Sequence, residues 1–415
     1  MSLNIIRKIK DFLRYQWPTL VHIAKLLPEF INARISQLFK VLPKSTKNIF
    51  FILDDQKLWD GANGNSRYIY LILNRFGRAG YNIYLYKRMN LKMYKQLGND
   101  GKLIFKIKNL KIINKLPENT ADITCIFDTI YKFVSEKKWK DCVYINTFKP
   151  PFCQIGELIW IPYFMYARNY STGQDELVGL YRNNQRKIKA LFAGNTNKQY
   201  YNNRKLGNYY GKLTRIEGVQ TLLELKDMVK CGESRDSFEE IMSIKDYAND
   251  CRILLTNEKF PIKLNEWFKL VSSSDFFICL SGTDYPMCHH TIESMALGTI
   301  PIISYPEWFF PPLEHMKNAV VYSGKEDFIE KVKDALNMPP TAINNMRINV
   351  IEYYEQYLSN ENFIRKFESQ RGQIFTIMLH PHLVCSKEIE EAGQKLYTQL
   401  QTLLKDQNTR NTASN

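Results

Sequence analysis

Short apolar runs and segments of helical period alternate along the chain from residue 48 onward. Residues 48–53 are apolar and have the length of a buried strand, and a polar, glycine-containing loop follows at residues 54–65. Residues 67–77 then carry apolar side chains at helical spacing after Ser66, a residue type that favours a helix start. Residues 81–86 form a second strand-length run. Strand, loop, helix and strand in this order predict a βαβ unit, the beginning of a parallel sheet.

The same alternation continues through the rest of the chain in two series. In the first series the further predicted strands are residues 103–107, 123–127 and 143–146. In the second, the predicted strands are 188–192, 252–255, 275–280 and 300–303, with helices at 263–272 and 291–297. Gly298 ends the last of these helices. Two α/β halves of roughly 130–180 residues each explain the pattern better than one large sheet.

The fold class predicted for the 415-residue chain is therefore α/β, with two Rossmann-like domains facing a cleft. The predicted divisions are residues 1–47 as a basic amphipathic helical segment, 48–175 as the first domain, 176–360 as the second, and 361–415 as helices and a frayed tail. A polar stretch at residues 169–186 is the predicted linker. The largest crevice of such a fold lies at the carboxyl ends of its strands, where a nucleotide-like ligand binds.

Composition excludes disorder and coiled coil, because 45% of the residues are hydrophobic and 24% charged. The formal net charge of +15 favours anionic partners. The eight cysteines include no CxxC pair, which indicates reduced thiols. The sequence contains no apolar run long enough to span a bilayer and no leader with a cleavage site, so we expect a cytoplasmic protein.

The positive charge is concentrated at the amino terminus. Residues 1–47 hold nine lysines and arginines against two acidic residues, so +7 of the net charge lies there. Five apolar side chains fall on one helical stripe, with the basic residues off it: Ile5, Ile6, Ile9, Phe12 and Leu13. This pattern predicts that residues 1–40 bind an anionic membrane surface, so that the protein is peripheral on the cytoplasmic face. The alternative is a helix packed on the protein's own core with a solvated basic face.

One segment carries a family resemblance. Residues 274–303 contain a strand, the loop Ser281-Gly282-Thr283-Asp284, a helix with Glu293, and the sequence Gly298-Thr-Ile-Pro-Ile-Ile303. This segment resembles the donor-binding part of GT-B-fold glycosyltransferases and is most similar to the exostosin-like group. Residues 311–313 and 318–322 also fit, and the loop at residues 60–68 is similar to the first loop of the acceptor domain in such enzymes.

The resemblance implies a site for a nucleotide-activated sugar. Glu293 would accept hydrogen bonds from sugar or ribose hydroxyls, and helix-start N–H groups would face the phosphates. His289 and His290 stand where the exostosin-like pattern carries arginine, and they would donate to phosphate or sugar oxygens. The donor-binding candidates are Gly194, Asn195, Lys198, Arg204, Gly282, Asp284, His290, Thr291 and Glu293. The competing explanations are that Glu293 complements the macrodipole of its helix and that Lys198 and Arg204 lie on the solvated surface.

The chemistry expected at this site needs neither metal nor cofactor, because the chain contains no Asp-x-Asp triad to bridge a diphosphate. Retaining enzymes of the resembled fold carry a second glutamate eight positions before the first, where this chain has Tyr285, so an inverting mechanism is expected. Inversion requires a general base. The predicted catalytic residues are Asp60 and Asp128, as alternative bases, and His289; a loop aspartate can equally be a turn former.

The predicted function is transfer of a sugar from a nucleotide-activated donor to a glycan, plausibly a lipid-linked precursor of a cell-surface polysaccharide. Two other classes remain open. The chain can be a glycosyltransferase-shaped scaffold subunit without turnover, since fold alone does not establish activity. Nucleic-acid binding is disfavoured, because outside residues 1–47 basic and acidic residues are interleaved and no nucleic-acid motif occurs.

Overall fold

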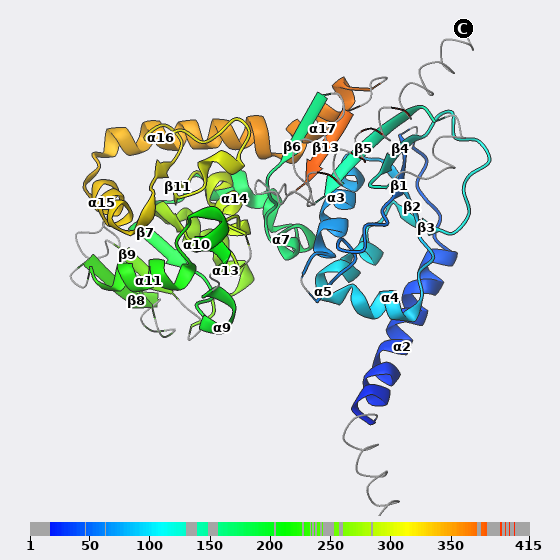
Figure 1. The fold of residues 1–415 in the computed structure, drawn as a ribbon, viewed down its shortest axis with the longest axis horizontal. Helices are drawn as coiled ribbons and strands as arrows, with labels where there is room; N and C mark the ends of the chain where they lie inside the picture. Colours follow the sequence, from blue (N-terminus) through cyan, green and yellow to red (C-terminus); the bar gives the residue numbers. More distant parts are fainter. Residues whose placement is uncertain are drawn as a thin grey trace, which may run out of the picture. The chain divides into compact units, whose positions relative to one another are not determined.

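The computed structural model describes most of the chain, and its helices and strands are drawn in Figure 1. The described residues are 17–45, 47–62, 64–129, 139–147, 157–202, 205–225, 228–232, 234, 236, 239, 240, 243, 253–256, 260–283, 285–371, 375–379, 391, 395, 398 and 402. The predicted helix at residues 5–14, Arg204, Asp284 and the polar tail lie outside them. The chain divides between Tyr144 and Ile145 into two compact units.

The first sheet has seven strands in the order β3-β2-β1-β4-β5-β13-β6. Its strands are β1 (Asn48–Ile52), β2 (Asn82–Tyr86), β3 (Leu110–Ile113), β4 (Thr124–Phe127), β5 (Asp141–Thr147), β6 (Glu157–Ile161) and β13 (Phe375–Leu379). Strand β1 pairs in parallel with β2 on one side and with β4 on the other. The predicted βαβ unit is confirmed, with α3 (Arg67–Arg78) as its crossover helix.

Two local predictions for this sheet differ from the structure. Residues 103–107, predicted as a strand, are mostly a 3₁₀ helix, η2 (Lys102–Lys106), and the strand of this region is β3. A short apolar run does not by itself distinguish a strand from a helix. Here Leu103, Ile104 and Ile107 are buried, and their spacing of one and three residues also fits a helix. Ser66 does not cap α3; its hydroxyl donates to the Leu97 carbonyl oxygen instead.

The remaining helices of the first unit lie on either side of β2 in the sequence. They are α2 (Trp17–Leu38), α4 (Leu91–Gln96) and α5 (Gly98–Gly101). Helix α2 places Pro18 in its first turn, where the missing N–H costs no hydrogen bond. Its inner face contributes Leu26 and Gln37, both at most 9% exposed. No helix among the described residues is long and apolar enough to cross a membrane.

The middle and the end of the chain contain elements that the sequence did not predict. The predicted linker holds three short helices: α7 (Ala167–Thr172), η4 (Gln174–Leu177) and α8 (Val178–Tyr181). The division at Tyr144 also precedes the predicted boundary at residue 175. In the segment predicted as helical, α17 (Asn360–Ser369) is followed by β13, which pairs in parallel with β6 through Ile377 and Ile159. An apolar run of this length fits a buried strand equally well.

The second sheet has six strands in the order β12-β11-β10-β7-β9-β8. They are β7 (Ile188–Ala193), β8 (Val229–Gly232), β9 (Ile253–Thr256), β10 (Ser274–Cys279), β11 (Ile300–Ile303) and β12 (Val320–Val321). Around them the chain forms α9 (Lys198–Tyr201), α10 (Lys205–Tyr210), α11 (Arg215–Leu223), α13 (Leu264–Ser272), α14 (His289–Ala296), α15 (Gly324–Asn337) and α16 (Pro340–Tyr353). The strand pairings of this sheet in the described part of the chain are parallel, so the prediction of two parallel-sheet α/β domains is confirmed.

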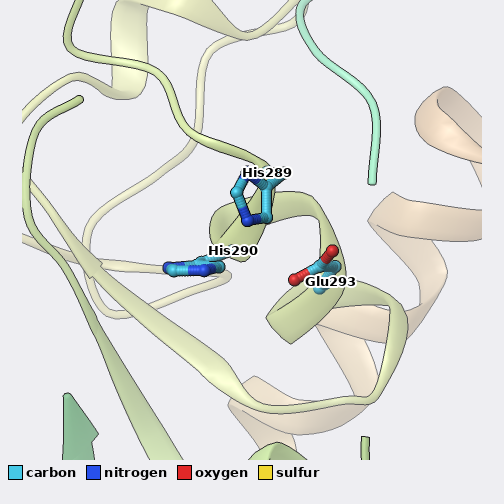
Figure 2. Close-up of side chains that lie close together, drawn as sticks. All are labelled: His289, His290 and Glu293. Atoms are coloured by element: carbon cyan, nitrogen blue, oxygen red, sulfur yellow. The ribbon is translucent and has the colours of Figure 1, made fainter. Parts of the chain in front are cut away.

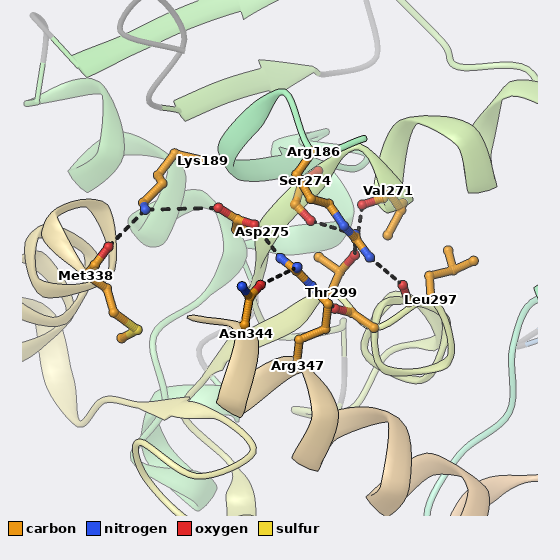
Figure 3. A network of polar contacts seen from close by, with 11 residues as sticks. Arg186, Lys189, Val271, Ser274, Asp275, Leu297, Thr299, Met338, Asn344 and Arg347 are labelled. Carbon is orange, nitrogen blue, oxygen red and sulfur yellow. Dashed lines mark hydrogen bonds and ion pairs between the residues drawn. The ribbon is translucent and has the colours of Figure 1, made fainter. Parts of the chain in front are cut away.

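A buried polar network holds the amino-terminal end of β10 to its neighbours (Figure 3). The Arg186 guanidinium donates to the carbonyl oxygens of Ser274 at 2.8 Å and Leu297 at 2.9 Å. Asp275, 3% exposed, forms ion pairs with Arg347 of α16 and, at 4.0 Å, with Lys189 of β7. Burial raises the pKa of Asp275, and the three surrounding cations lower it. The network fixes β7, β10 and α16 together at the strand ends opposite the carboxyl-terminal loops.

Candidate functional site

The candidate site lies at the carboxyl ends of β7 and β10. These strands are parallel neighbours, with Ala190 opposite Phe276. In the sheet, β9 and β8 lie on one side of β7, and β10, β11 and β12 lie on the other side, so the strand order reverses at β7 and β10. Ligands of open α/β sheets bind outside the carboxyl ends of the strands at such a reversal. The loops there begin with Gly194 after β7 and with Ser281 and Gly282 after β10.

Arg215 is the central cation of this region. It is the first residue of α11, and its residue surface is 4% exposed. Its Nε donates to the Ser281 carbonyl oxygen at 3.1 Å and its Nη1 to the Asn195 carbonyl oxygen at 3.3 Å. The guanidinium also lies 4.0 Å from the centre of the Tyr201 ring. Among the described residues no carboxylate pairs with it, so a buried positive charge stands between the two loops with only neutral partners.

Gly282 leaves no room for a side chain, whereas a Cβ on Gly194 would make ordinary contacts. A Cβ on Gly282 would lie 2.6 Å from the Tyr285 carbonyl oxygen and 2.8 Å from that of Met287. A Cβ on Gly194 would lie 3.4 Å from Arg215 Nη1 and 3.5 Å from His290 Cε1. Close approach of the backbone explains the glycine at 282, and Gly194 lies beside the Arg215 and His290 side chains.

Glu293, on the second turn of α14, is fully buried and accepts three hydrogen bonds. Its Oε1 accepts from the Tyr166 backbone N–H and the Asn169 side-chain amide, both at 2.8 Å. Its Oε2 accepts from the Trp267 indole at 2.7 Å. Burial raises the pKa of Glu293 to about 8, although each of the three donors lowers it. The carboxyl group therefore titrates near neutral pH and retains acceptor capacity at Oε2.

His289 and His290 precede Glu293 on the same helix, and all three side chains lie close together (Figure 2). The two imidazole rings are 4.2 Å apart at their centres. His290 also packs on Trp267, with ring centres 4.7 Å apart, and His289 lies near Tyr166 at 5.5 Å. Burial, the adjacent His289 and Arg215 lower the pKa of His290 well below its usual value. His290 is therefore neutral at physiological pH and offers one N–H donor and one acceptor.

These three residues are also a possible metal-ligand set. One ligand atom from each of His289, His290 and Glu293 lies within 4.8 Å of the other two. Neutral imidazole and carboxylate are ligand types that suit zinc and other first-row metals. The three hydrogen bonds at Glu293 already occupy most of its acceptor positions, which leaves one direction at Oε2 for a metal or for a ligand hydroxyl. The expectation of a metal-free site stays a prediction.

Other predicted donor residues are less central. The Thr291 hydroxyl is buried and lies 3.0 Å from the Tyr305 hydroxyl, a contact that packs α14 against β11 and its following loop. The Asn195 side chain is exposed and accepts from the Asn197 backbone N–H at 2.8 Å. Lys198 is exposed on α9. Arg204 and Asp284 lie outside the described residues.

The two predicted bases belong to the first unit and differ in environment. Asp128 is fully buried, and its oxygens accept from the backbone N–H groups of Asp54 and Asp55, each at 2.9 Å. These bonds join the segment that follows β1 to the residue that follows β4 in the first sheet. Asp60 is partly exposed, and its Oδ1 accepts from the Ala62 backbone N–H at 3.0 Å. Both contacts are of the turn-forming kind that loop aspartates commonly make.

Sequence reasoning missed three groups of the site: Arg215, Trp267 and the Tyr166–Asn169 turn. A signal existed for Arg215 alone. Thr214 and Glu217 form a reciprocal capping box at the start of α11, a pattern of Ser or Thr followed three residues later by Glu. That pattern marks the start of α11, the third helix after the Gly194 loop, and the packing of the structure brings Arg215 back to that loop. The donors to Glu293 come from segments 26 to 127 residues away, which no local pattern connects.

No protein-family model matches the chain, and no curated protein matches it. Similar solved structures include Anabaena HepE in complex with UDP and glucose, with 10% identity, 78% of this chain and 98% of that chain covered, and a TM-score of 0.40. Sucrose-phosphate synthase from Thermosynechococcus elongatus has 9% identity, coverages of 78% and 98%, and a TM-score of 0.38. The β-glucosyltransferase of phage T4 has 10% identity, coverages of 78% and 99%, and a TM-score of 0.35. The exostosin-like grouping stays a prediction.

Proposed function

We propose that this protein is a glycosyltransferase that takes its sugar from a nucleotide-activated donor, and that the donor's diphosphate binds between the loops after β7 and β10. The observation that carries the proposal is the buried Arg215 guanidinium, held between Asn195 and Ser281 with no carboxylate partner in the part of the chain that the structure describes. A buried cation with only neutral acceptors is costly, and a bound anion offsets that cost. A diphosphate is the anion of matching size and charge at such a strand edge.

Two buried polar atoms near Arg215 and Glu293 also lack partners among the described residues. They are the Ser281 hydroxyl oxygen, in the loop after β10, and Asn169 Oδ1, beside Glu293. Buried polar groups are nearly always hydrogen-bonded, so unsatisfied ones at a strand edge favour a missing polar ligand. Ser281 is placed to donate to a phosphate oxygen, whereas Asn169 Oδ1 and Glu293 Oε2 are acceptors for sugar or ribose hydroxyls.

The site supports departure of the nucleoside diphosphate without a metal. As the bond between the sugar and the diphosphate breaks, negative charge grows on the leaving group. The Arg215 guanidinium and the N–H donors of His289 and His290 stabilise that charge in a largely desolvated environment. We propose that the transfer inverts the configuration at the anomeric carbon of the sugar, and that Asp60 is the base that takes the proton of the acceptor hydroxyl. Asp128 is the weaker candidate, because its oxygens are already occupied by backbone donors.

The proposed acceptor is a glycan, plausibly lipid-linked and part of polysaccharide biosynthesis, reached by a protein that is peripheral on the cytoplasmic face of a membrane. The +7 charge of residues 1–47 supports this location, since each lysine or arginine near an anionic leaflet contributes about 1 kcal/mol. Removal of residues 1–40 should release the protein from anionic vesicles in a sedimentation assay. Unchanged sedimentation would contradict the membrane role of this segment.

A calorimetric titration with uridine, cytidine, guanosine and thymidine diphosphates tests the proposal directly. We expect the full chain to bind one of them, and Glu293→Ala to bind it more weakly because a ribose acceptor is lost. The thermal unfolding of the variant must be measured alongside, since Glu293 also fixes Trp267 and Asn169. Absence of binding to all four nucleotides would contradict the enzyme proposal. Binding without turnover would instead favour the scaffold subunit.

A further inference from the structure

A pocket in the first unit combines positive charge with apolar walls. It lies between α2 and β3, has a volume of about 260 Å³, and is remote in sequence from every residue of the candidate site. Its lining residues are Arg34, Gln37, Leu38, Met89, Phe105, Lys111, Ile112, Ile113, Asn114 and Lys115. The volume is smaller than that of most drug-sized ligand pockets, so it suits a single headgroup rather than a nucleotide.

The charged residues that line the pocket are all cations. Arg34, Lys111 and Lys115 line it, and no acidic residue does. Among the described residues, none of these three cations forms an ion pair. Arg34 Nη1 donates to the Met89 carbonyl oxygen at 3.4 Å. Three cations around a small volume attract a multiply charged anion such as a phosphate.

A second, independent observation points to a bound acceptor group. Gln37 is 5% exposed, and its Oε1 accepts from the Ile112 backbone N–H at 3.0 Å. That bond fixes the orientation of the amide, and its Nε2 has no partner among the described residues. A buried N–H₂ group normally has an acceptor. Here it lines the same pocket as the three cations, where a phosphate oxygen would satisfy it.

The outer face of α2 indicates where such a phosphate comes from. Leu27, Ile31, Ile35 and Leu38 follow one another at spacings of three or four residues and are 42 to 67% exposed. Phe39 and Val41 extend this stripe at 80 and 89% exposure. Leu38 belongs to both features, because it also lines the pocket. An apolar stripe continuous with a cationic phosphate site matches the chemistry of a lipid at a bilayer interface.

We propose that the pocket between α2 and β3 binds the phosphate headgroup of an anionic membrane lipid while the exposed stripe of α2 lies in the acyl boundary. This inference builds on the membrane location in the proposed function and gives it a specific ligand site. It does not depend on the nucleotide site, which is formed by other residues.

The test is sedimentation of the full chain with vesicles of phosphatidylcholine, alone or mixed with phosphatidic acid. The pocket variant carries Arg34→Gln, Lys111→Gln and Lys115→Gln. The control variant carries Lys57→Gln, Lys92→Gln and Lys140→Gln, an equal change of charge at exposed lysines of the same unit. We expect the pocket variant to bind phosphatidic-acid vesicles about 100-fold more weakly than the wild type, and the control to lose much less. Equal loss in both variants would overturn the proposal.

Two further variants separate the possible occupants. Gln37→Glu keeps the acceptor for Ile112 but replaces the free donor with a carboxylate, so it should weaken vesicle binding; unaltered binding by a folded variant would count against the pocket.

The double variant Ile31→Ser with Ile35→Ser tests the apolar stripe and should also weaken vesicle binding. If this double variant kept full vesicle binding while inorganic phosphate competed, the pocket would be a free-anion site. If it instead converted a dimer to a monomer by light scattering, the stripe would be a subunit interface. Either result would overturn the lipid assignment.

Nucleotide titration of the pocket variant distinguishes this inference from the proposed function. We expect wild-type nucleotide affinity in the pocket variant, because Arg215 and Glu293 are untouched. Lost vesicle binding with retained nucleotide binding would support both proposals. Retained vesicle binding would remove the pocket proposal and leave the nucleotide proposal standing.

Discussion

Replacing Arg215 with glutamine is the sharpest single perturbation of the proposed donor site. The variant loses a guanidinium that donates to Ser281 and Asn195 at 3.1 and 3.3 Å and lies 4.0 Å from the Tyr201 ring. Hydrogen bonds from a charged donor are worth about 1.5–3 kcal/mol each. If the guanidinium makes two such bonds to a diphosphate, its loss should weaken nucleotide binding by about 3 kcal/mol or more, which is at least about 100-fold.

The loss of two structural hydrogen bonds also lowers the stability of the variant, by roughly 1–3 kcal/mol. A matched control is therefore needed, and Arg186 provides it. Arg186 is likewise buried and donates to backbone carbonyls, but at the opposite end of β10, where it holds Ser274. Arg186→Gln should cost comparable stability and leave nucleotide affinity unchanged. Arg215→Lys should bind with intermediate affinity, because it keeps the charge but not the planar fork.

The assay is calorimetric titration with the nucleoside diphosphate that the wild type prefers, performed well below the Tm of each variant. Thermal unfolding of the free proteins gives the stability change separately. Equal weakening by Arg215→Gln and Arg186→Gln would show that stability, and not a phosphate contact, governs binding. Wild-type affinity in Arg215→Gln would refute the assignment of the diphosphate to this guanidinium.

Three further predictions concern titration, the buried network and the base. Because the pKa of Glu293 is raised from 4.5 to about 8, its ionisation disfavours the folded state, so stability should fall as pH rises between these values, by about 5 kcal/mol at most. Glu293→Gln should remove this part of the pH dependence of Tm, and parallel curves for wild type and variant would contradict it. Arg347→Met leaves buried Asp275 with one ion pair, to Lys189 at 4.0 Å, and should cost about 3 kcal/mol in chemical denaturation; an unchanged midpoint would mean that the Arg347 contact adds no stability. Asp60→Asn should lower kcat about 100-fold or more with unchanged nucleotide affinity. If Asp128→Asn lowered kcat and Asp60→Asn did not, Asp128 would be the base.

The central strands of both sheets were predictable because a parallel sheet covered on both faces requires continuous apolar runs. Strands β1, β7 and β10 are buried along nearly their whole length, and each was predicted within one or two residues. The same criterion failed at residues 103–107, where a buried 3₁₀ helix produces a similar run. It also left β13 unrecognised, since nothing local distinguishes its apolar run from a buried helix segment.

The candidate site was predictable only where it follows the strands. Gly194, Gly282, His290 and Glu293 lie within a few residues of a strand or helix end, so their grouping follows from the order of elements. Arg215 reaches the site from a helix start 20 residues after Asn195, and its burial without a carboxylate is a property of the packed structure.

The surroundings of Glu293 were equally hidden from the sequence. Its partners Tyr166 and Trp267 come from two other parts of the chain, and they lower a pKa that burial raises to about 8. Both of its carboxylate oxygens are engaged with other segments rather than with the start of α14.

Release of nucleoside diphosphate from a panel of nucleotide-sugars tests the central claim most directly. The measurement uses the full chain, with and without a membrane extract that supplies lipid-linked glycans as acceptors. We predict that the wild type and Arg186→Gln release the nucleoside diphosphate from one donor, that the extract accelerates the release, and that Arg215→Gln abolishes it. A wild-type protein that binds the nucleotide but releases it from no donor, with or without acceptor, would contradict the claim that this chain is a glycosyltransferase.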